Sequence, residues 1–306
     1  MELRQLRSLT TLVEQNFNVS RTAEKLNLVQ PAISQHLKQL ENELGVPLFQ
    51  RHGKRLIGLS QSGKEVLHYA RKILSAAASL TAIGTEHQQQ NHGVLRIGAT
   101  HTQARYVLPA AIHRFRQIYP DVEIQLHQGT PEQLVNMAIK DHVDLAICTE
   151  ALDKSAELSF KTIYHWNRCL IAPQQHPILQ HKQITLKQLC EHPLITYIFG
   201  FTGRGNLNQT FKQASLQPQI ALSAADTDVI KTYVREGLGI GIIAGLAFNE
   251  SEDHDLQQRD LSHLFPWETT KIAYLNDKYL RTFQRRFIEL FQQETQWIST
   301  KNSEQK

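Results

Sequence analysis

The sequence predicts an α/β protein of several domains, because three observations agree. The chain has 306 residues, which is more than one ordinary core holds. Apolar residues recur at helical spacing through residues 1–92, whereas short apolar strands alternate with helical segments over residues 93–306. We therefore expect a helical N-terminal module, a connecting helix and a larger α/β region.

Composition argues against a membrane or exported protein. Hydrophobic residues make up 41% of the chain, and no apolar run approaches the roughly 18 residues that would span a bilayer. Residues 1–15 lack a basic stretch followed by an apolar block and a cleavage site. We expect a cytoplasmic protein without a membrane partner.

The net charge of +4 lies in the first third of the chain. Residues 1–92 carry 11 Lys and Arg against 7 Asp and Glu, while residues 93–306 are balanced. Residues 49–64 contain four basic side chains and no acid. This surplus suits a surface that faces phosphates, with a solvated basic loop as the alternative.

The first sixty residues have the spacing of a helix-turn-helix. A first helix is followed by Ser20, which offers the N-cap of a helix over residues 20–26, and Asn27 tolerates the left-handed conformation of a sharp turn. Pro31 suits the first turn of a third helix, whose apolar stripe leaves one face polar. We expect that recognition helix to contact DNA through four side chains, Gln30, Ser34, Gln35 and Lys38.

A wing and a long helix follow the third helix. Residues 49–58 predict a two-stranded wing whose phosphate contacts are Arg51, Lys54 and Arg55. The next helix has apolar residues at alternating spacings of four and three, from Val66 to Leu80, as in a coiled-coil seam. This seam favours a dimer over packing on its own domain. We assign residues 1–60 to a winged helix-turn-helix, and residues 61–92 to the linker helix and hinge.

Three runs in this region resemble the signature of LysR-type transcription regulators. These runs are Ala23-Glu24-Lys25-Leu26, Gln30-Pro31-Ala32-Ile33-Ser34 and Leu37-Lys38-Gln39-Leu40-Glu41. The resemblance extends over the whole chain. It implies promoter DNA as a partner, a dimer of dimers (a homotetramer), and contact with RNA polymerase.

Residues 93–306 predict two α/β lobes that face a cleft. Strands alternate with helices, which implies mostly parallel sheets, and the number of elements exceeds what one lobe holds. We place lobe I at about residues 93–162 and 268–298, and lobe II at about residues 163–267. The architecture is that of a periplasmic-binding-protein-like effector domain.

Hydroxyl and amide side chains occur where the predicted strands end. In folds of this kind, ligands bind at the carboxyl ends of the strands. The three clusters follow residues 94–99, 145–148 and 194–197. Together with helix N-termini they suit a carboxylate or an oxyanion such as sulfate, to which Arg105 and Arg204 can add charge. Helix capping by these Thr residues is the alternative.

The sensor region resembles the CysB subgroup of LysR-type regulators, which controls sulfur assimilation and cysteine biosynthesis. The resemblance is carried by residues 100–106, 164–168, 199–204 and 228–234. It implies an activator whose inducer is N-acetylserine or O-acetylserine, opposed by sulfate or thiosulfate. The subgroup's anion-contacting residues match here at Thr100, Thr102, Gln103, Thr149 and Thr202.

Other functional classes fit the sequence less well. The glycines of residues 237–245 resemble a dinucleotide fingerprint, but they end a predicted helix and precede a strand, which is the wrong context for a Rossmann-type oxidoreductase. Cys148, Cys169 and Cys190 form no CxxC pair, so we expect buried thiols and no metal site. We expect that the protein is not an enzyme and that it binds no cofactor. The nearest alternative is a LysR-type regulator that senses another small carboxylate, such as an aromatic acid.

Overall fold

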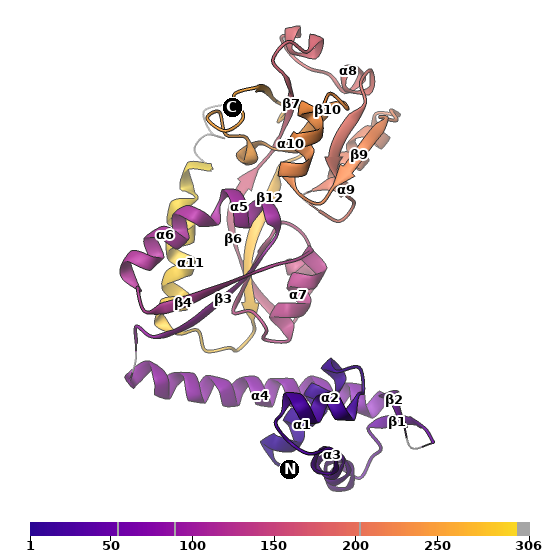
Figure 1. Cartoon of the computed structure of the whole chain (residues 1–306), viewed down its shortest axis with the longest axis vertical. Coiled ribbons are helices and arrows are strands. Elements are labelled where there is room, and N and C mark those ends of the chain that lie inside the picture. Colours follow the sequence, from indigo (N-terminus) through magenta and orange to yellow (C-terminus); the bar gives the residue numbers. More distant parts are fainter. Residues whose placement is uncertain (54, 89, 202, 299–306) are drawn as a thin grey trace. The chain divides into compact units, whose positions relative to one another are not determined.

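The computed structural model describes residues 1–53, 55–88, 90–201 and 203–298. The chain divides into two compact units (Figure 1). The first contains Met1–Gln88 with Asp277–Leu280, and the second contains the remaining residues. Among the described helices, none is both long and apolar enough to cross a membrane.

The first unit is a winged helix-turn-helix followed by a long helix. Its elements are α1 (Leu3–Glu14), α2 (Val19–Lys25), α3 (Gln30–Leu44), β1 (Phe49–His52), β2 (Arg55–Leu59) and α4 (Gln61–Gln88). β1 and β2 pair in an antiparallel ribbon. Leu9, Leu12, Ile33 and Leu40 are completely buried in a core that joins the first three helices, as the apolar spacing predicted.

The start of α2 differs from the prediction. Asn18 is the N-cap, because its side-chain oxygen accepts a hydrogen bond from the backbone N–H of Arg21 at 3.1 Å, and Ser20 lies inside the helix. Asn27 adopts the predicted left-handed conformation, with φ of 53°, in the turn between α2 and α3. The turn is therefore as expected, although the helix begins earlier.

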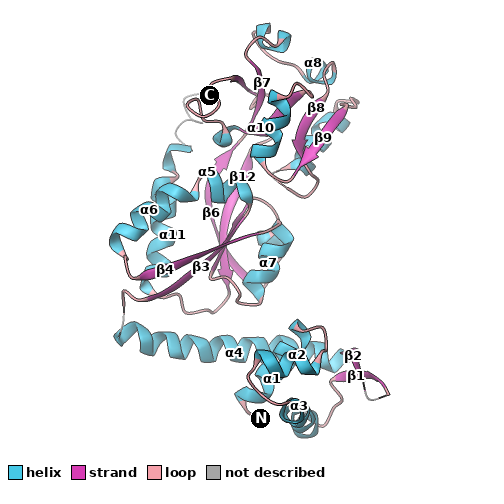
Figure 2. Ribbon diagram, in the orientation of Figure 1, coloured by secondary structure: helices cyan, strands magenta, loops and turns pink. Residues whose placement is uncertain are grey.

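Lobe I is a five-stranded sheet in the order β4-β3-β5-β12-β6. Figure 2 shows its strands in magenta between helices in cyan. Its strands are β3 (Gly93–Ala99), β4 (Val122–Gln128), β5 (Leu145–Cys148), β6 (Leu158–Trp166) and β12 (Glu268–Leu275). Its helices are α5 (His101–Tyr106), α6 (Leu108–Ile118), α7 (Pro131–Ile139), η1 (Leu152–Lys154) and α11 (Thr282–Glu294). Helices α6 and α11 pack on each other on one side of the sheet, and α7 covers the other (Figure 1).

Lobe II is a second five-stranded sheet in the order β11-β7-β10-β8-β9. Its strands are β7 (Arg168–Pro173), β8 (Leu194–Tyr197), β9 (Ile220–Ala224), β10 (Ile240–Ala244) and β11 (Leu256–Asp260). Its helices are η2 (Pro177–Gln180), α8 (Leu186–Cys190), α9 (Arg204–Gln213), α10 (Thr227–Arg235) and η3 (Gly245–Ala247). Phe211 and Leu207 of α9 anchor that helix on the core.

Two predictions about the lobes were wrong in detail. Both sheets are mixed, because β12 runs antiparallel to β5 and β6, and β7 runs antiparallel to β10 and β11. The short helix α5 was not predicted; it follows β3 and meets α6 at Val107, ahead of Pro109. The glycine segment is as predicted, because Gly237 follows α10 with φ of 76° and β10 comes next.

Candidate DNA-binding surface and effector site

The predicted DNA-contacting face of α3 is exposed. Ile33, Leu37 and Leu40 hold the helix on the core, which leaves the opposite face to solvent. The exposed side chains include all four predicted contacts, Gln30, Ser34, Gln35 and Lys38. Gln30 donates a 2.7 Å hydrogen bond to the hydroxyl of Ser20, so α2 orients it.

The wing presents two described arginines to solvent. Arg51 lies 2.9 Å from the carboxylate of Glu41, whereas Arg55 has no ion pair among the described residues. Arg55 lines a groove of about 370 Å³ that also includes Arg21 of α2. The predicted contact Lys54 lies outside the described residues. Arg55 is therefore the described wing cation that is freer to meet a phosphate.

Two exposed apolar residues at the start of α3 were not predicted as DNA contacts. Val29, the N-cap residue, is 67% exposed, and Leu28 before it is 41% exposed. Both residues lie in the turn, away from the apolar stripe of α3. An exposed apolar group at the N-terminus of a recognition helix can contact a thymine methyl group. The sequence does contain a signal for this contact, because the two apolar residues do not fit the spacing of the buried stripe of α3.

The seam on α4 divides into two parts. Ala70 is buried and Val66 packs against the core of the first unit. This part of the helix therefore packs on its own domain, which was the alternative to a dimer seam. Further along the helix, Ile73 is 37% exposed and Leu80 is 71% exposed. The second part of the seam remains available to a partner.

The four described residues of the predicted effector site lie at neighbouring strand ends in lobe I. β3 and β5 are parallel neighbours with Ala99 opposite Ile147, so Thr100 and Thr149 follow adjacent strands. Thr100 is the N-cap residue of α5, and Thr102 and Gln103 lie in the first turn of that helix. The side chains of Thr100, Thr102 and Gln103 are at most 5% exposed. The fifth predicted residue, Thr202, lies outside the described residues.

Aromatic side chains of β6 orient this cluster. The Tyr164 hydroxyl donates to Oε1 of Gln103, and the Trp166 indole N–H donates to the Thr149 hydroxyl at 3.3 Å. Burial raises the pKa of Tyr164 well above its usual range, so it stays a hydrogen-bond donor. These aromatics belong to a segment that carries the family resemblance, but they were not predicted as site residues, because Tyr164 and Gln103 are 61 residues apart in the sequence.

Lobe II meets the cluster through β8 and α10. The buried hydroxyl of Tyr197 lies 2.6 Å from that of Thr227, and the Thr102 side chain of lobe I lies near enough to act against the burial that raises the pKa of Tyr197. Burial raises the pKa of Tyr197 to about 12. The two lobes are thus joined by neutral hydroxyl contacts beside the predicted site.

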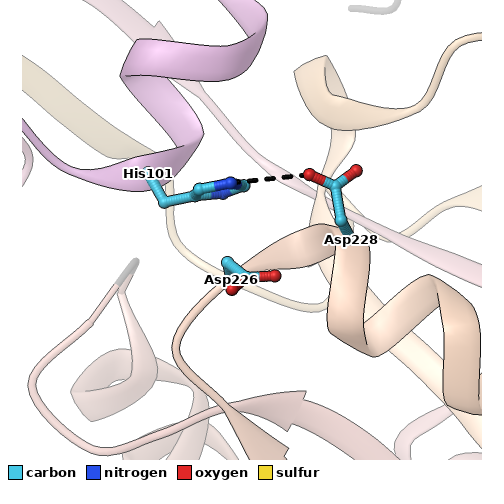
Figure 3. Close-up of side chains that lie close together, drawn as sticks. All are labelled: His101, Asp226 and Asp228. Carbon is cyan, nitrogen blue, oxygen red and sulfur yellow. Dashed lines mark ion pairs between the residues drawn. The ribbon is translucent and has the colours of Figure 1, made fainter. Parts of the chain in front are cut away.

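A charged set also connects α5 to lobe II. The Tyr106 hydroxyl donates to Asp228 at 2.7 Å, and His101 Nε2 lies 3.5 Å from the other oxygen of Asp228 (Figure 3). Arg105 lies 3.1 Å from Glu252. His101, Asp226 and Asp228 offer ligand atoms within 4.8 Å of one another. These two aspartates already have protein partners, because Asp226 caps α10 and Asp228 holds Tyr106, so we interpret the set as a contact between the lobes.

Glu150 is a buried carboxyl next to Thr149. Its Oε1 accepts a hydrogen bond from the backbone N–H of Gly203, at the start of α9 in lobe II. Its Oε2 is buried and has no hydrogen-bond partner among the described residues. Burial raises the pKa of Glu150 to about 7, with a further contribution from Glu268. Glu150 belongs to the second predicted strand-end cluster, but it was not among the predicted ligand contacts, since a single Glu after a strand has no distinctive pattern.

A buried ion pair holds the other side of Gly203. Arg168 lies 2.5 Å from Glu268 and donates to the Gly203 carbonyl at 2.7 Å. Asn206 donates to both oxygens of Glu268. Gly203 has φ of 70°, and a side chain there would overlap Arg168 and Glu268. The start of α9 is therefore fixed from both faces.

Two family models match the chain. The model described as "LysR substrate binding domain" matches residues 88–296, and "Bacterial regulatory helix-turn-helix protein, lysR family" matches residues 3–64. The HTH-type transcriptional regulator CysB of Haemophilus influenzae is 43% identical over 95% of this chain and 90% of its own length.

Solved structures agree with these matches. The cofactor-binding domain of the Cbl transcriptional regulator is 39% identical, with a TM-score of 0.63, over 65% of this chain and 87% of its own. Full-length OxyR of Pseudomonas aeruginosa aligns over 96% of this chain and 94% of its own, with a TM-score of 0.72. At 22% identity, the likeness to OxyR concerns the fold alone.

Proposed function

Because the chain belongs to the LysR-type family of transcription regulators, which are ligand-responsive DNA-binding proteins and not enzymes, we propose that it activates sulfur assimilation and cysteine biosynthesis genes. The proposed inducer is N-acetylserine or O-acetylserine, and sulfate or thiosulfate oppose it. The resemblance to the CysB subgroup supports the pathway. The hydroxyl-lined cluster at the ends of β3 and β5 supports the class of ligand.

The convergence of neutral donors in lobe I is the observation that carries the proposal. Thr100, Gln103 and Thr149 lie at adjacent strand ends, and the aromatic partners of Gln103 and Thr149, which are Tyr164 and Trp166, are themselves buried. Hydroxyl, amide and helix N-terminal groups bind carboxylates and oxyanions without a fixed counter-charge. Such a set suits a ligand that carries one small anionic group.

Glu150 supports an acetylserine over a simple oxyanion as inducer. Its Oε2 is a buried acceptor next to Thr149 that no described residue uses. N-acetylserine has an amide N–H and O-acetylserine has an ammonium group, and either can donate to this oxygen. Sulfate and thiosulfate have no such donor. The two ligand classes would therefore make different contacts at one site.

The contacts between the lobes offer a route from ligand to DNA. A ligand shifts a conformational equilibrium only by its differential affinity for the two states. The hydrogen bond from Tyr106 to Asp228 joins the lobes beside the site, and Tyr197 of lobe II lies close to Thr102 of lobe I. We infer that an inducer alters these contacts and thereby changes how effector domains pair in the oligomer.

The DNA-binding form would be a dimer of dimers in the cytoplasm. The exposed part of the α4 seam, at Ile73 and Leu80, supports pairing of two copies, because one helix cannot bury such a stripe alone. Two α3 helices would then read two half-sites. RNA polymerase completes the proposed set of partners.

Calorimetric titration of the full-length protein tests the proposed ligands. The titrants are N-acetylserine, O-acetylserine, sulfate, thiosulfate and benzoate. We expect the acetylserines to bind and the two sulfur oxyanions to compete with them. Binding of benzoate in place of the acetylserines would instead favour the aromatic-acid alternative.

Replacing Arg55 by Ala is expected to weaken DNA binding on all sequences alike. The plot of log K against log salt has a negative slope, and loss of one phosphate contact makes this slope less steep by about 0.9 for each Arg55 removed. Fluorescence anisotropy on specific and random duplexes at several salt concentrations measures this slope. Lys140→Ala, a change on the surface of lobe I, is the matched control. An unchanged slope for Arg55→Ala would remove the wing from the interface.

A further inference from the structure

Lobe II contains a cavity that is lined only by residues of that lobe. It is a groove of about 870 Å³ between α9 and the segment that leads to β9. Arg204, Asn208 and Lys212 line one side, at successive spacings of four on α9. Phe211, Leu216 and Ile220 add apolar surface. Acidic side chains are absent from the described lining.

Arg204 is a buried cation without a partner in the described chain. It is 8% exposed, and its Nη1 is fully buried with no hydrogen bond. Burial alone lowers the pKa of Arg204, and no neighbouring acid among the described residues offsets this. Arg168 in the same lobe shows the usual arrangement, because it meets Glu268 and two backbone carbonyls. Both arginines are buried, but only Arg168 is neutralised.

A buried charge without a counter-charge costs several kcal/mol by general experience. A ligand that brings a counter-charge would offset this cost. The groove places Lys212 on the same face as Arg204, so its field favours an anion. The apolar side chains favour a ligand with a hydrocarbon body.

We propose that this groove binds a small organic anion, a carboxylate attached to an apolar body, through Arg204 and Lys212. The site is separate from the hydroxyl cluster of lobe I, whose residues take no part in its lining. Arg204, which the sequence analysis considered as a source of charge for the effector, therefore serves a second ligand. The proposal holds whichever effector binds between the lobes.

Cys190 provides a reporter, because its half-buried thiol lines the groove while Cys148 and Cys169 are buried. The probe is hexanoate, and hexanamide is its neutral counterpart. In the full-length protein we expect hexanoate, but not hexanamide, to slow the reaction of Cys190 with a disulfide reagent. The Arg204→Gln variant should need about tenfold more hexanoate for the same protection, as for loss of a hydrogen bond to a charged group.

Two further measurements make the result decisive. Thr149→Val should keep full protection by hexanoate, because it alters only the lobe I cluster. Without ligand, Arg204→Gln should unfold at the same temperature as the parent or higher, since it removes an uncompensated charge. Equal protection by hexanamide, full protection of Arg204→Gln, loss of protection in Thr149→Val, or marked destabilisation of Arg204→Gln would each overturn the proposal.

Discussion

Replacing Glu268 by Gln is expected to lower the free energy of unfolding of the two-lobed region by about 3 kcal/mol, because breaking a buried ion pair leaves one charge uncompensated. Arg168 and Glu268 are 3% and 7% exposed at their side chains. The substituted amide would keep the shape and can still form hydrogen bonds, but it would remove the counter-charge of Arg168. The ion pair, rather than side-chain volume, is therefore what the variant tests.

Urea unfolding followed by tryptophan fluorescence measures this effect selectively. The three tryptophans, Trp166, Trp267 and Trp297, all lie in the second unit. With a slope of about 3 kcal/mol per M, the midpoint should fall by about 1 M. Glu289→Gln, which breaks an exposed pair with Arg286, is the control and should change the free energy by less than about 0.5 kcal/mol. Equal effects of the two variants would show that burial of the first pair has no energetic consequence.

Replacing Glu150 by Gln is expected to stabilise the two-lobed region at pH 8 and to leave it unchanged near pH 4.5. Burial raises the pKa of Glu150 from its ordinary value of 4.5 to about 7. The folded chain therefore holds a proton that the unfolded chain releases, so stability falls as pH rises from 4.5 to 7 and then levels off. Each pKa unit corresponds to about 1.36 kcal/mol, so this pKa shift lowers the free energy of unfolding by about 3 kcal/mol.

The amide introduced by Glu150→Gln remains neutral at every pH, and its oxygen can still accept from the Gly203 N–H. The difference in unfolding free energy between variant and parent should thus grow from about zero to about 3 kcal/mol across this window. The same tryptophan-detected urea curves at pH 4.5, 6 and 8 measure it. A variant that is less stable than the parent at pH 8 would mean that the ionised carboxylate holds Gly203.

Local patterns predicted the N-terminal module well. The apolar period of α1 and α3, the left-handed turn at Asn27 and the proline at the start of α3 are properties of neighbouring residues. Such signals act within one or two helical turns. The N-cap was misplaced because Asn18 and Ser20 are both good capping residues, and only the backbone path selects between them.

The effector site could be predicted only in part. Thr100 and Thr149 were found because each follows an apolar strand, and parallel strands end at a common edge. Arg168 and Glu268 are 100 residues apart, and Tyr164 reaches Gln103 across 61 residues. No local pattern links such partners. The antiparallel insertion of β12 between β5 and β6 brings them together, and alternation of strands and helices does not reveal that insertion.

The hydroxyl cluster of lobe I is tested most directly by calorimetric titration of Thr149→Val and Thr100→Val with the acetylserine that binds the parent protein. These substitutions keep side-chain shape and remove the hydroxyl donors. We predict at least about tenfold weaker binding in each variant, the cost of about one lost hydrogen bond to a charged group, with promoter DNA affinity in the absence of ligand unchanged. Unaltered acetylserine affinity in both variants would contradict the assignment of the effector to the ends of β3 and β5.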